Sequence, residues 1–319
     1  MLRTALTDRF GLEVPVVGAP MAYVGGGALA AAVSGAGGLG MVGVGGSTPV
    51  EAVREEGARA AAAGRPFGVG LMAWALESRP ELFDAALAAG PSLVSVSFGD
   101  YRPWVARLRD AGVASATQVG DTAEARAAVD AGVDVVVARG SEAGGHGRDR
   151  VATLPLLEAV LDLVESPVLA AGGVASGRGL AAALAAGAAG AWVGTALLAS
   201  PEAALTPRAV ERLLAAGEGD TVVTTVFDVA QGLAWPEDYP GRALANDFWR
   251  RWRGHEDELA DDPDARRALA DARRDGDLDV AYLYAGQAVG ALRRVRPAGD
   301  VVAEMAAGAE RLLARWSAR

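Results

Sequence analysis

One of only two histidines in this chain of 319 residues lies in a stretch that is rich in glycine. The stretch runs from Arg139 to Asp149, reads RGSEAGGHGRD and carries His146. It follows the apolar run DVVVA (134–138), which predicts a buried strand. Imidazole suits proton transfer near neutral pH because its unperturbed pKa is about 6.5. Since glycine lets a ligand approach the backbone closely, the stretch predicts a ligand-binding loop with one acid–base group.

Two interpretations of His146 compete. An isolated histidine is more often buried and satisfied by backbone groups than catalytic, whereas its place in this loop favours function. His255, in RGHED (253–257), has no such setting and is expected to be a solvated helix residue. Glu142 is expected either to support the loop or to be exposed.

The composition favours a globular protein that acts on small molecules. Hydrophobic residues make up 51% of the chain and charged residues 22%, which predicts a sizeable core. The net charge of -10 disfavours nonspecific binding to nucleic acid or to an anionic membrane. Without cysteine there is no disulfide, thiolate metal site or cysteine nucleophile, and two histidines argue against zinc. We therefore expect no metal site.

The N-terminal segment predicts a cytoplasmic protein. Charges at Arg3, Asp8, Arg9 and Glu13 leave no apolar core for a signal peptide. No uninterrupted apolar run reaches the roughly 20 residues of a membrane span either. We expect neither a membrane nor a nucleic acid as partner.

Eight short apolar runs alternate with alanine-rich segments and predict the strands of a parallel sheet. The strands are expected at 14–19, 39–44, 67–71, 93–97, 114–119, 133–138, 168–171 and 191–194. The helices between them are expected at 28–34, 49–63, 80–89, 104–111, 122–131, 154–164 and 177–186. Several helices end in Ala-Gly pairs, where glycine suits the left-handed cap. Eight units fit an α/β fold of the (β/α)8 TIM barrel type better than an open, doubly wound sheet.

The rhythm breaks after Thr195, where charges and tryptophans become frequent. We predict that 1–216 and 280–319 form the barrel and that 217–279 form a small, mostly helical inserted domain after strand eight. Its tryptophans, Trp235, Trp249 and Trp252, are expected either to cover the active site or to pack the domain's own core.

The loops after strands seven and eight predict an anion site. Barrel enzymes often bind phosphate there, with backbone N–H groups and a helix N-terminus facing the anion. This chain offers Gly172 and Gly173 after strand seven, and Gly194 and Thr195 after strand eight. A single Gly-Gly pair is more often only a tight turn, but two such loops at these strands favour phosphate binding.

Five segments together resemble one known family. They are PM (20–21), EAGGH (142–146), AGGV (171–174), VGT (193–195) and GQ (286–287). The chain is similar over nearly its whole length to the nitronate monooxygenases, formerly called 2-nitropropane dioxygenases. The resemblance implies an FMN-binding barrel that oxidises alkyl nitronates with O2, and it is compatible with a homodimer.

The resemblance also implies a set of site residues. His146 matches the family's catalytic histidine. The residues expected to bind FMN are Pro20, Met21, Gly70, Gln118, Arg139, Gly144, Gly145, Gly172, Gly173, Gly194, Thr195 and Gln287. Two of them differ from the family: many members have asparagine where this chain has Gly70, and glutamine or lysine where it has Arg139. Arg139 is expected to face the pyrimidine end of the flavin and to stabilise negative charge there.

Three functions follow as alternatives. The first is oxidation of alkyl nitronates or nitroalkanes with O2, with His146 as general base or as the group that orients the substrate. The second is an NAD(P)H-dependent flavin reductase of the enoyl-acyl-carrier-protein reductase or quinone reductase type, since those enzymes look similar. The third is a noncatalytic protein that binds flavin or a metabolite.

Overall fold

A closed barrel of eight parallel strands forms the centre of the computed structural model, which describes residues 2–317, with the backbone alone for the last two. The strands are β1 (Val16–Gly18), β2 (Leu39–Gly43), β3 (Phe67–Met72), β4 (Leu93–Ser97), β5 (Ala114–Val119), β6 (Val135–Arg139), β8 (Val168–Ala171) and β9 (Gly190–Val193). β1 pairs with both β2 and β9, which closes the ring. The predicted TIM barrel is confirmed, because each of the eight predicted strands is present.

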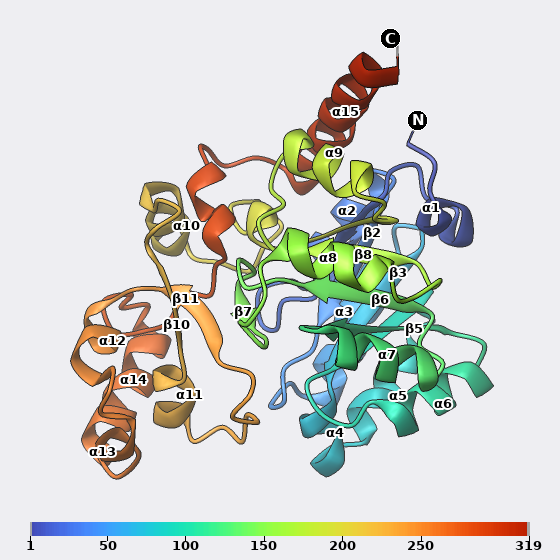
Figure 1. The fold of residues 1–319 in the computed structure, drawn as a ribbon. Coiled ribbons are helices and arrows are strands. Elements are labelled where there is room, and N and C mark those ends of the chain that lie inside the picture. Colours follow the sequence, from blue (N-terminus) through green and yellow to red (C-terminus); the bar gives the residue numbers. More distant parts are fainter. Residues whose placement is uncertain (1, 318–319) are drawn as a thin grey trace.

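Helices surround the barrel (Figure 1). They are α2 (Gly27–Gly35), α3 (Val50–Ala61), α4 (Ala73–Ser78), α5 (Glu81–Ala88), α6 (Arg102–Asp110), α7 (Thr122–Asp130), α8 (Thr153–Leu161), α9 (Gly177–Ala185) and α15 (Ala298–Ser317). α15 packs against α9 and α2, so the C-terminal helix completes the outer layer. The strands are apolar runs because both of their faces are buried, as in β6, which is buried at every position.

A short N-terminal helix, α1 (Ala5–Phe10), closes one end of the barrel. Its Leu6 is fully buried in the same cluster as the strand residues Val17, Leu39 and Leu169. Thr4 caps the helix and donates a hydrogen bond to the carbonyl oxygen of Ala189, just before β9. The other end of the barrel, where the strands reach their carboxyl ends, is left for the site.

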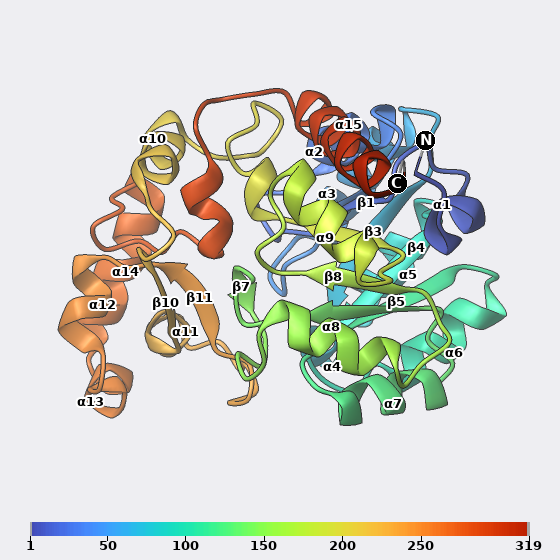
Figure 2. The same ribbon diagram turned by 45° about the horizontal axis from the view of Figure 1, so that its top comes forward.

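The segment after β9 contains helices and a small sheet. The elements are η1 (Thr195–Leu197), α10 (Pro207–Ala215), β10 (Thr221–Thr224), α11 (Val226–Gln231), β11 (Gly241–Leu244), α12 (Asp247–Trp252), α13 (Glu256–Ala260) and α14 (Pro263–Asp275). Its core includes Phe227, Phe248, Trp252 and Leu269. In Figure 2 this segment lies to the left of the barrel, with α12 and α13 farthest from the barrel strands.

An antiparallel sheet joins this segment to the barrel. β11 pairs with β10 on one side and with β7 (Gly145–His146) on the other. β7 belongs to the glycine-rich loop that leaves β6. The sheet was not predicted, because its strands are two to four residues long and depend on partners far away in the sequence.

The chain returns to the barrel through an extended stretch and the 3-10 helix η2 (Gln287–Ala291). Tyr282 packs on the core of the inserted segment, and Tyr284 forms an isolated bridge with Ala243 of β11. The division at 216/217 and 279/280 stays a prediction. Among the residues that the structure describes, no helix has both the length and the apolar character needed to cross a membrane.

Candidate active site

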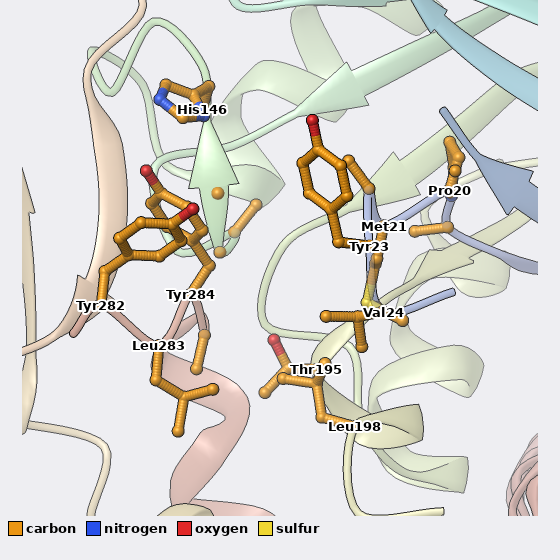
Figure 3. Close-up of a pocket in the computed structure, with 18 of the residues that line it drawn as sticks. Pro20, Met21, Tyr23, Val24, His146, Thr195, Leu198, Tyr282, Leu283 and Tyr284 are labelled. Carbon is orange, nitrogen blue, oxygen red and sulfur yellow. The ribbon is translucent and has the colours of Figure 1, made fainter. Parts of the chain in front are cut away.

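A cavity of about 1030 Å³ opens at the carboxyl ends of the barrel strands, between the barrel and the inserted segment. Its volume is at the upper limit of about 300–1,000 Å³ that is typical of ligand pockets. Twelve of the thirteen predicted site residues line it: Pro20, Met21, Gly70, Gln118, Arg139, Gly144, Gly145, His146, Gly172, Gly173, Gly194 and Thr195. Figure 3 shows His146 and Tyr284 on one side of the cavity and Met21 and Tyr23 on the other.

Gln287 is the exception among the predicted site residues. Its side chain is exposed and does not line the cavity. Its backbone N–H instead donates to the carbonyl oxygen of Glu142, at 3.0 Å, where η2 begins. Gln287 therefore contacts the glycine-rich loop through its backbone.

His146 is paired with a carboxylate from the inserted segment. Nε2 of His146 lies 3.0 Å from each oxygen of Asp228, which is on α11. Both side chains are almost fully buried, with 9% and 7% of their surfaces exposed. An ionised carboxylate can only accept, so it holds the imidazole tautomer with its proton on Nε2. That leaves the lone pair on Nδ1.

Two aromatic rings complete the surroundings of the imidazole. The ring of His146 is stacked on Trp235, with centroids 3.6 Å apart and planes 5° apart. Tyr284 lies 5.2 Å from the His146 ring, and its hydroxyl donates to Asp228 at 3.4 Å. Burial, followed by the nearby charge of Asp228, raises the pKa of Tyr284 well above its usual value. Tyr284 is therefore a neutral hydrogen-bond donor to the carboxylate.

Arg139 fixes the glycine-rich loop through hydrogen bonds to its backbone. Its guanidinium is buried, and Nη2 donates to the carbonyl oxygens of Ala143, Gly144 and Gly145 at 3.2, 3.2 and 2.8 Å. Burial lowers the pKa of Arg139 to about 10, and the charge of Asp149 opposes this effect. The residue remains charged at neutral pH. Arg139 thus fixes the loop, a role for which the sequence carries no signal.

Glu142 supports the same loop, one of its two expected roles. Its Oε2 accepts hydrogen bonds from the backbone N–H and the hydroxyl of Thr153, the first residue of α8, at 2.8 and 2.7 Å. Arg242 of β11 holds the loop from the other side, donating to the carbonyl oxygen of Ser141 and pairing with Asp149. Both ends of the loop are therefore tied to neighbouring elements.

The loops after β8 and β9 form a cradle in which side chains are nearly absent. Gly173 has a φ of 71°, in the region that favours glycine, and its added Cβ would have one neighbour, 3.8 Å away. An added Cβ on Gly194 would meet Ala19 and Met21 only at ordinary contact distances of 3.5 and 3.6 Å. Thr195 lies beside them and accepts a hydrogen bond from the N–H of Gly286. The cradle therefore has room for a group of phosphate size.

Gly70, where the family that the sequence resembles often has asparagine, is packed tightly against the β1 loop. A Cβ added to Gly70 would lie 2.3 Å from Cγ of Pro20, so no side chain fits there without a shift of the β1 loop. Another residue that lines the cavity, Trp74, has a buried Nε1 with no hydrogen-bond partner within residues 2–317. An unpaired buried donor in a cavity wall is consistent with a ligand that carries acceptors.

Three residues of the site were not identified from the sequence as partners of His146: Asp228, Trp235 and Tyr284. Trp235 lines the cavity, which agrees with the first of the two expected roles, whereas Trp252 is buried in the core of the inserted segment. Asp228 has no sequence signal, since no motif surrounds it. His255, as expected, is exposed and pairs with Glu258 on the surface.

Comparisons with known proteins agree with this architecture. FabK from Thermotoga maritima is similar in structure, with a TM-score of 0.87 and 30% identity, and the match covers 100% of this chain and 99% of that one. A nitroalkane oxidase from Streptomyces ansochromogenes has a TM-score of 0.83 and 34% identity, with 98% and 100% covered.

Two proteins of similar sequence carry different names. The nitronate monooxygenase npaC of Metarhizium robertsii is 34% identical over 329 residues, which covers 91% of this chain and 89% of that protein. The (3aS,4S,5R,7aS)-5-hydroxy-7a-methyl-1-oxo-octahydro-1H-indene-4-carboxyl-CoA dehydrogenase of Rhodococcus jostii is 37% identical over 227 residues. That match covers 71% of this chain and 64% of the dehydrogenase, slightly less than two thirds of its length.

The sequence model for nitronate monooxygenase matches residues 3–308, nearly the whole chain. Together with the barrel and the histidine-bearing loop at its mouth, this match shows that the chain belongs to the nitronate monooxygenase family, a family of oxidoreductases.

Proposed function

We propose that the protein is an FMN-dependent oxidoreductase that oxidises alkyl nitronates, or the parent nitroalkanes, with O2. The observation that carries this proposal is the pair of His146 and Asp228, which faces the same cavity as the glycine cradle. A base on one wall and an anion cradle on another suit a flavin with a small substrate beside it.

The cradle residues fit the cofactor. Gly173, Gly194 and Thr195 would hold the FMN phosphate, and Met21, Gln118 and Gly144 would lie along the isoalloxazine. FMN, when bound, supplies the two-electron chemistry by which a nitronate is oxidised and O2 is reduced. The closed barrel fixes these residues on strand ends, so the cradle needs little rearrangement for binding.

His146 would act as the proton acceptor. For a neutral nitroalkane, Nδ1 would take the α-proton, so that the C–H bond breaks, an N–H bond forms and the electron pair moves into the nitro group. Asp228 would stabilise the imidazolium that results, because its carboxylate lies 3.0 Å from Nε2. With a nitronate as substrate, no proton is removed and His146 would orient the anion. Trp235 would exclude water from the face of the imidazole that it covers.

Anaerobic mixing tests the proposal. The purified holoprotein is mixed in turn with ethyl nitronate, propionate 3-nitronate, NADH and NADPH, and the flavin absorbance is followed. We expect each of the two nitronates to bleach the flavin, and we expect O2 to restore its colour. Bleaching by NADH or NADPH alone would favour the NAD(P)H-dependent flavin reductase, and a flavin that no compound reduces would overturn the assignment as an enzyme of either kind.

A further inference from the structure

The outer wall of the cavity is basic, although the whole chain carries a net charge of -10. Three arginines of α14, Arg266, Arg267 and Arg273, line the cavity. Arg266 and Arg273 are seven residues apart, which is close to two turns of an α-helix, so they lie on one face. A small nitronate bound beside His146 does not account for this wall.

Two of these arginines have no carboxylate partner. Arg267 pairs with Asp264, and the neighbouring Arg274 pairs with Asp271. By contrast, no acidic side chain within residues 2–317 forms an ion pair with Arg266. Arg273 donates to the neutral Oε1 of Gln231, at 2.9 Å, and lies over the ring of Tyr282. The positive charges of Arg266 and Arg273 are therefore available to a ligand in the cavity.

α11 connects these arginines with the site of proton transfer. α14 packs against α11 (Figure 1). Nη2 of Arg266 lies beside Gly232, where an added Cβ would be 2.5 Å from it, and Arg273 holds Gln231 at the end of the same helix. Arg266, Arg273 and His146 all line the same cavity. One ligand in this cavity can therefore contact the arginines at one end and the region of His146 at the other.

The space between the two places suits an organic ligand of more than a few atoms. The side chains of Tyr23 and Leu233 line the cavity and are 54% and 41% exposed, respectively, so they offer apolar surface near its opening. The lining of the cavity runs from the strand ends, where the flavin is proposed to bind, out to α14. The cavity therefore extends past the residues proposed for the flavin, toward the arginines.

We propose that Arg266 and Arg273 form an anion subsite that binds the phosphate or pyrophosphate group of an extended ligand whose other end reaches His146. Two guanidinium groups match a multiply charged phosphate, because each can donate paired hydrogen bonds to its oxygens. Such a group is carried by coenzyme A thioesters and by nicotinamide nucleotides. Binding here does not depend on nitronate oxidation, so the two can be tested apart.

Isothermal titration calorimetry of the holoprotein tests the subsite with three probes: inorganic pyrophosphate, coenzyme A and NADH. We expect pyrophosphate and at least one of the two larger molecules to bind, and the affinity to fall about tenfold or more in Arg266→Met/Arg273→Met. Coenzyme A binding without NADH binding would indicate a coenzyme A thioester as the ligand. NADH binding without coenzyme A binding would indicate a nicotinamide nucleotide.

The matched control is Arg250→Met/Arg274→Met, which removes the same charge from paired, exposed arginines outside the cavity. It should bind the probes within about twofold of the unchanged protein. FMN content and melting temperature should be unchanged in Arg266→Met/Arg273→Met, so that a loss of probe binding reports on the subsite and not on the fold. Absence of binding by all three probes, or an equal loss in the control, would overturn the subsite and leave the proposed oxidation standing.

Discussion

Both carboxylate oxygens of Asp228 lie 3.0 Å from Nε2 of His146, although the two residues are 82 positions apart in the sequence. The histidine comes from a loop of the barrel, and the aspartate comes from the inserted segment. Because the carboxylate accepts the Nε2 proton, it sets both the tautomer and the direction of the ring. The inserted segment therefore supplies a direct partner of this histidine and does more than cover the cavity.

Asp228→Asn should lower kcat/KM for a neutral nitroalkane about 100-fold, because the amide can donate to Nε2 and favour the tautomer with no lone pair on Nδ1. The loss should be much smaller for a preformed nitronate, which needs no proton removal. Steady-state oxygen consumption with both substrates measures the difference. Asp247→Asn, at an exposed aspartate paired with Arg250, is the control. Equal losses for both substrates would show that Asp228 has another role.

Arg139→Met should destabilise the protein by about 2–4 kcal/mol, because three partly buried carbonyl oxygens of the loop lose their buried donor. Chemical denaturation measures the free energy of unfolding, and FMN affinity should fall with it as the loop loosens. Arg139→Lys should recover part of the stability through a single donor group. Arg126→Met, at an exposed position of α7, serves as the control. Unchanged stability together with weaker FMN binding would instead favour a direct role of Arg139 at the flavin.

Gly194→Ala should keep the fold and weaken FMN binding about tenfold. The new methyl group makes only ordinary contacts with the protein, at 3.5 and 3.6 Å, but occupies the cradle proposed for the phosphate. Flavin fluorescence during titration of the apoprotein measures the affinity. Gly219→Ala, in open space outside the cavity, should leave it unchanged. Unchanged FMN affinity in Gly194→Ala would contradict the placement of the phosphate at Gly194.

The stretch that carries Trp235 should loosen at high pH. Burial, together with the charge of Glu124, raises the pKa of Tyr239 from about 10 to about 12, so the folded state favours the neutral phenol. The stabilisation is complete below pH 10 and is lost as the pH rises from about 10 to about 12. The difference in unfolding free energy between the unchanged protein and Tyr239→Phe should therefore be constant up to pH 10 and change above it. If the unfolding free energies of the two proteins change equally between pH 10 and pH 12, the raised pKa of Tyr239 is contradicted.

The sequence predicted those parts of the molecule that local patterns determine. Eight buried strands appear as apolar runs, and the cradle appears as glycines such as Gly173 and Gly194 at strand ends, because close approach to backbone demands glycine. His146 was identified by its place in such a loop.

The partners of His146 could not be predicted in the same way. Asp228 is on a six-residue helix with no motif, and it reaches the histidine only because β11 pairs with β7. That pairing depends on two register pairs between segments nearly a hundred residues apart, which no local periodicity records. The role of Arg139 was hidden for a related reason: its acceptors are backbone carbonyls, and carbonyls are present in every sequence.

The pairing of His146 with Gly241 also bears on how the site comes into being. A ribosome makes the barrel strands and the histidine loop before it reaches β11, so the nascent chain carries an unpaired loop until residues 241–244 have emerged. The barrel alone cannot complete the surroundings of His146, because a chain that stops before β11 lacks the strand that pairs with it. The contacts of His146 with Asp228 and Trp235 therefore form only after the later part of the chain has been made.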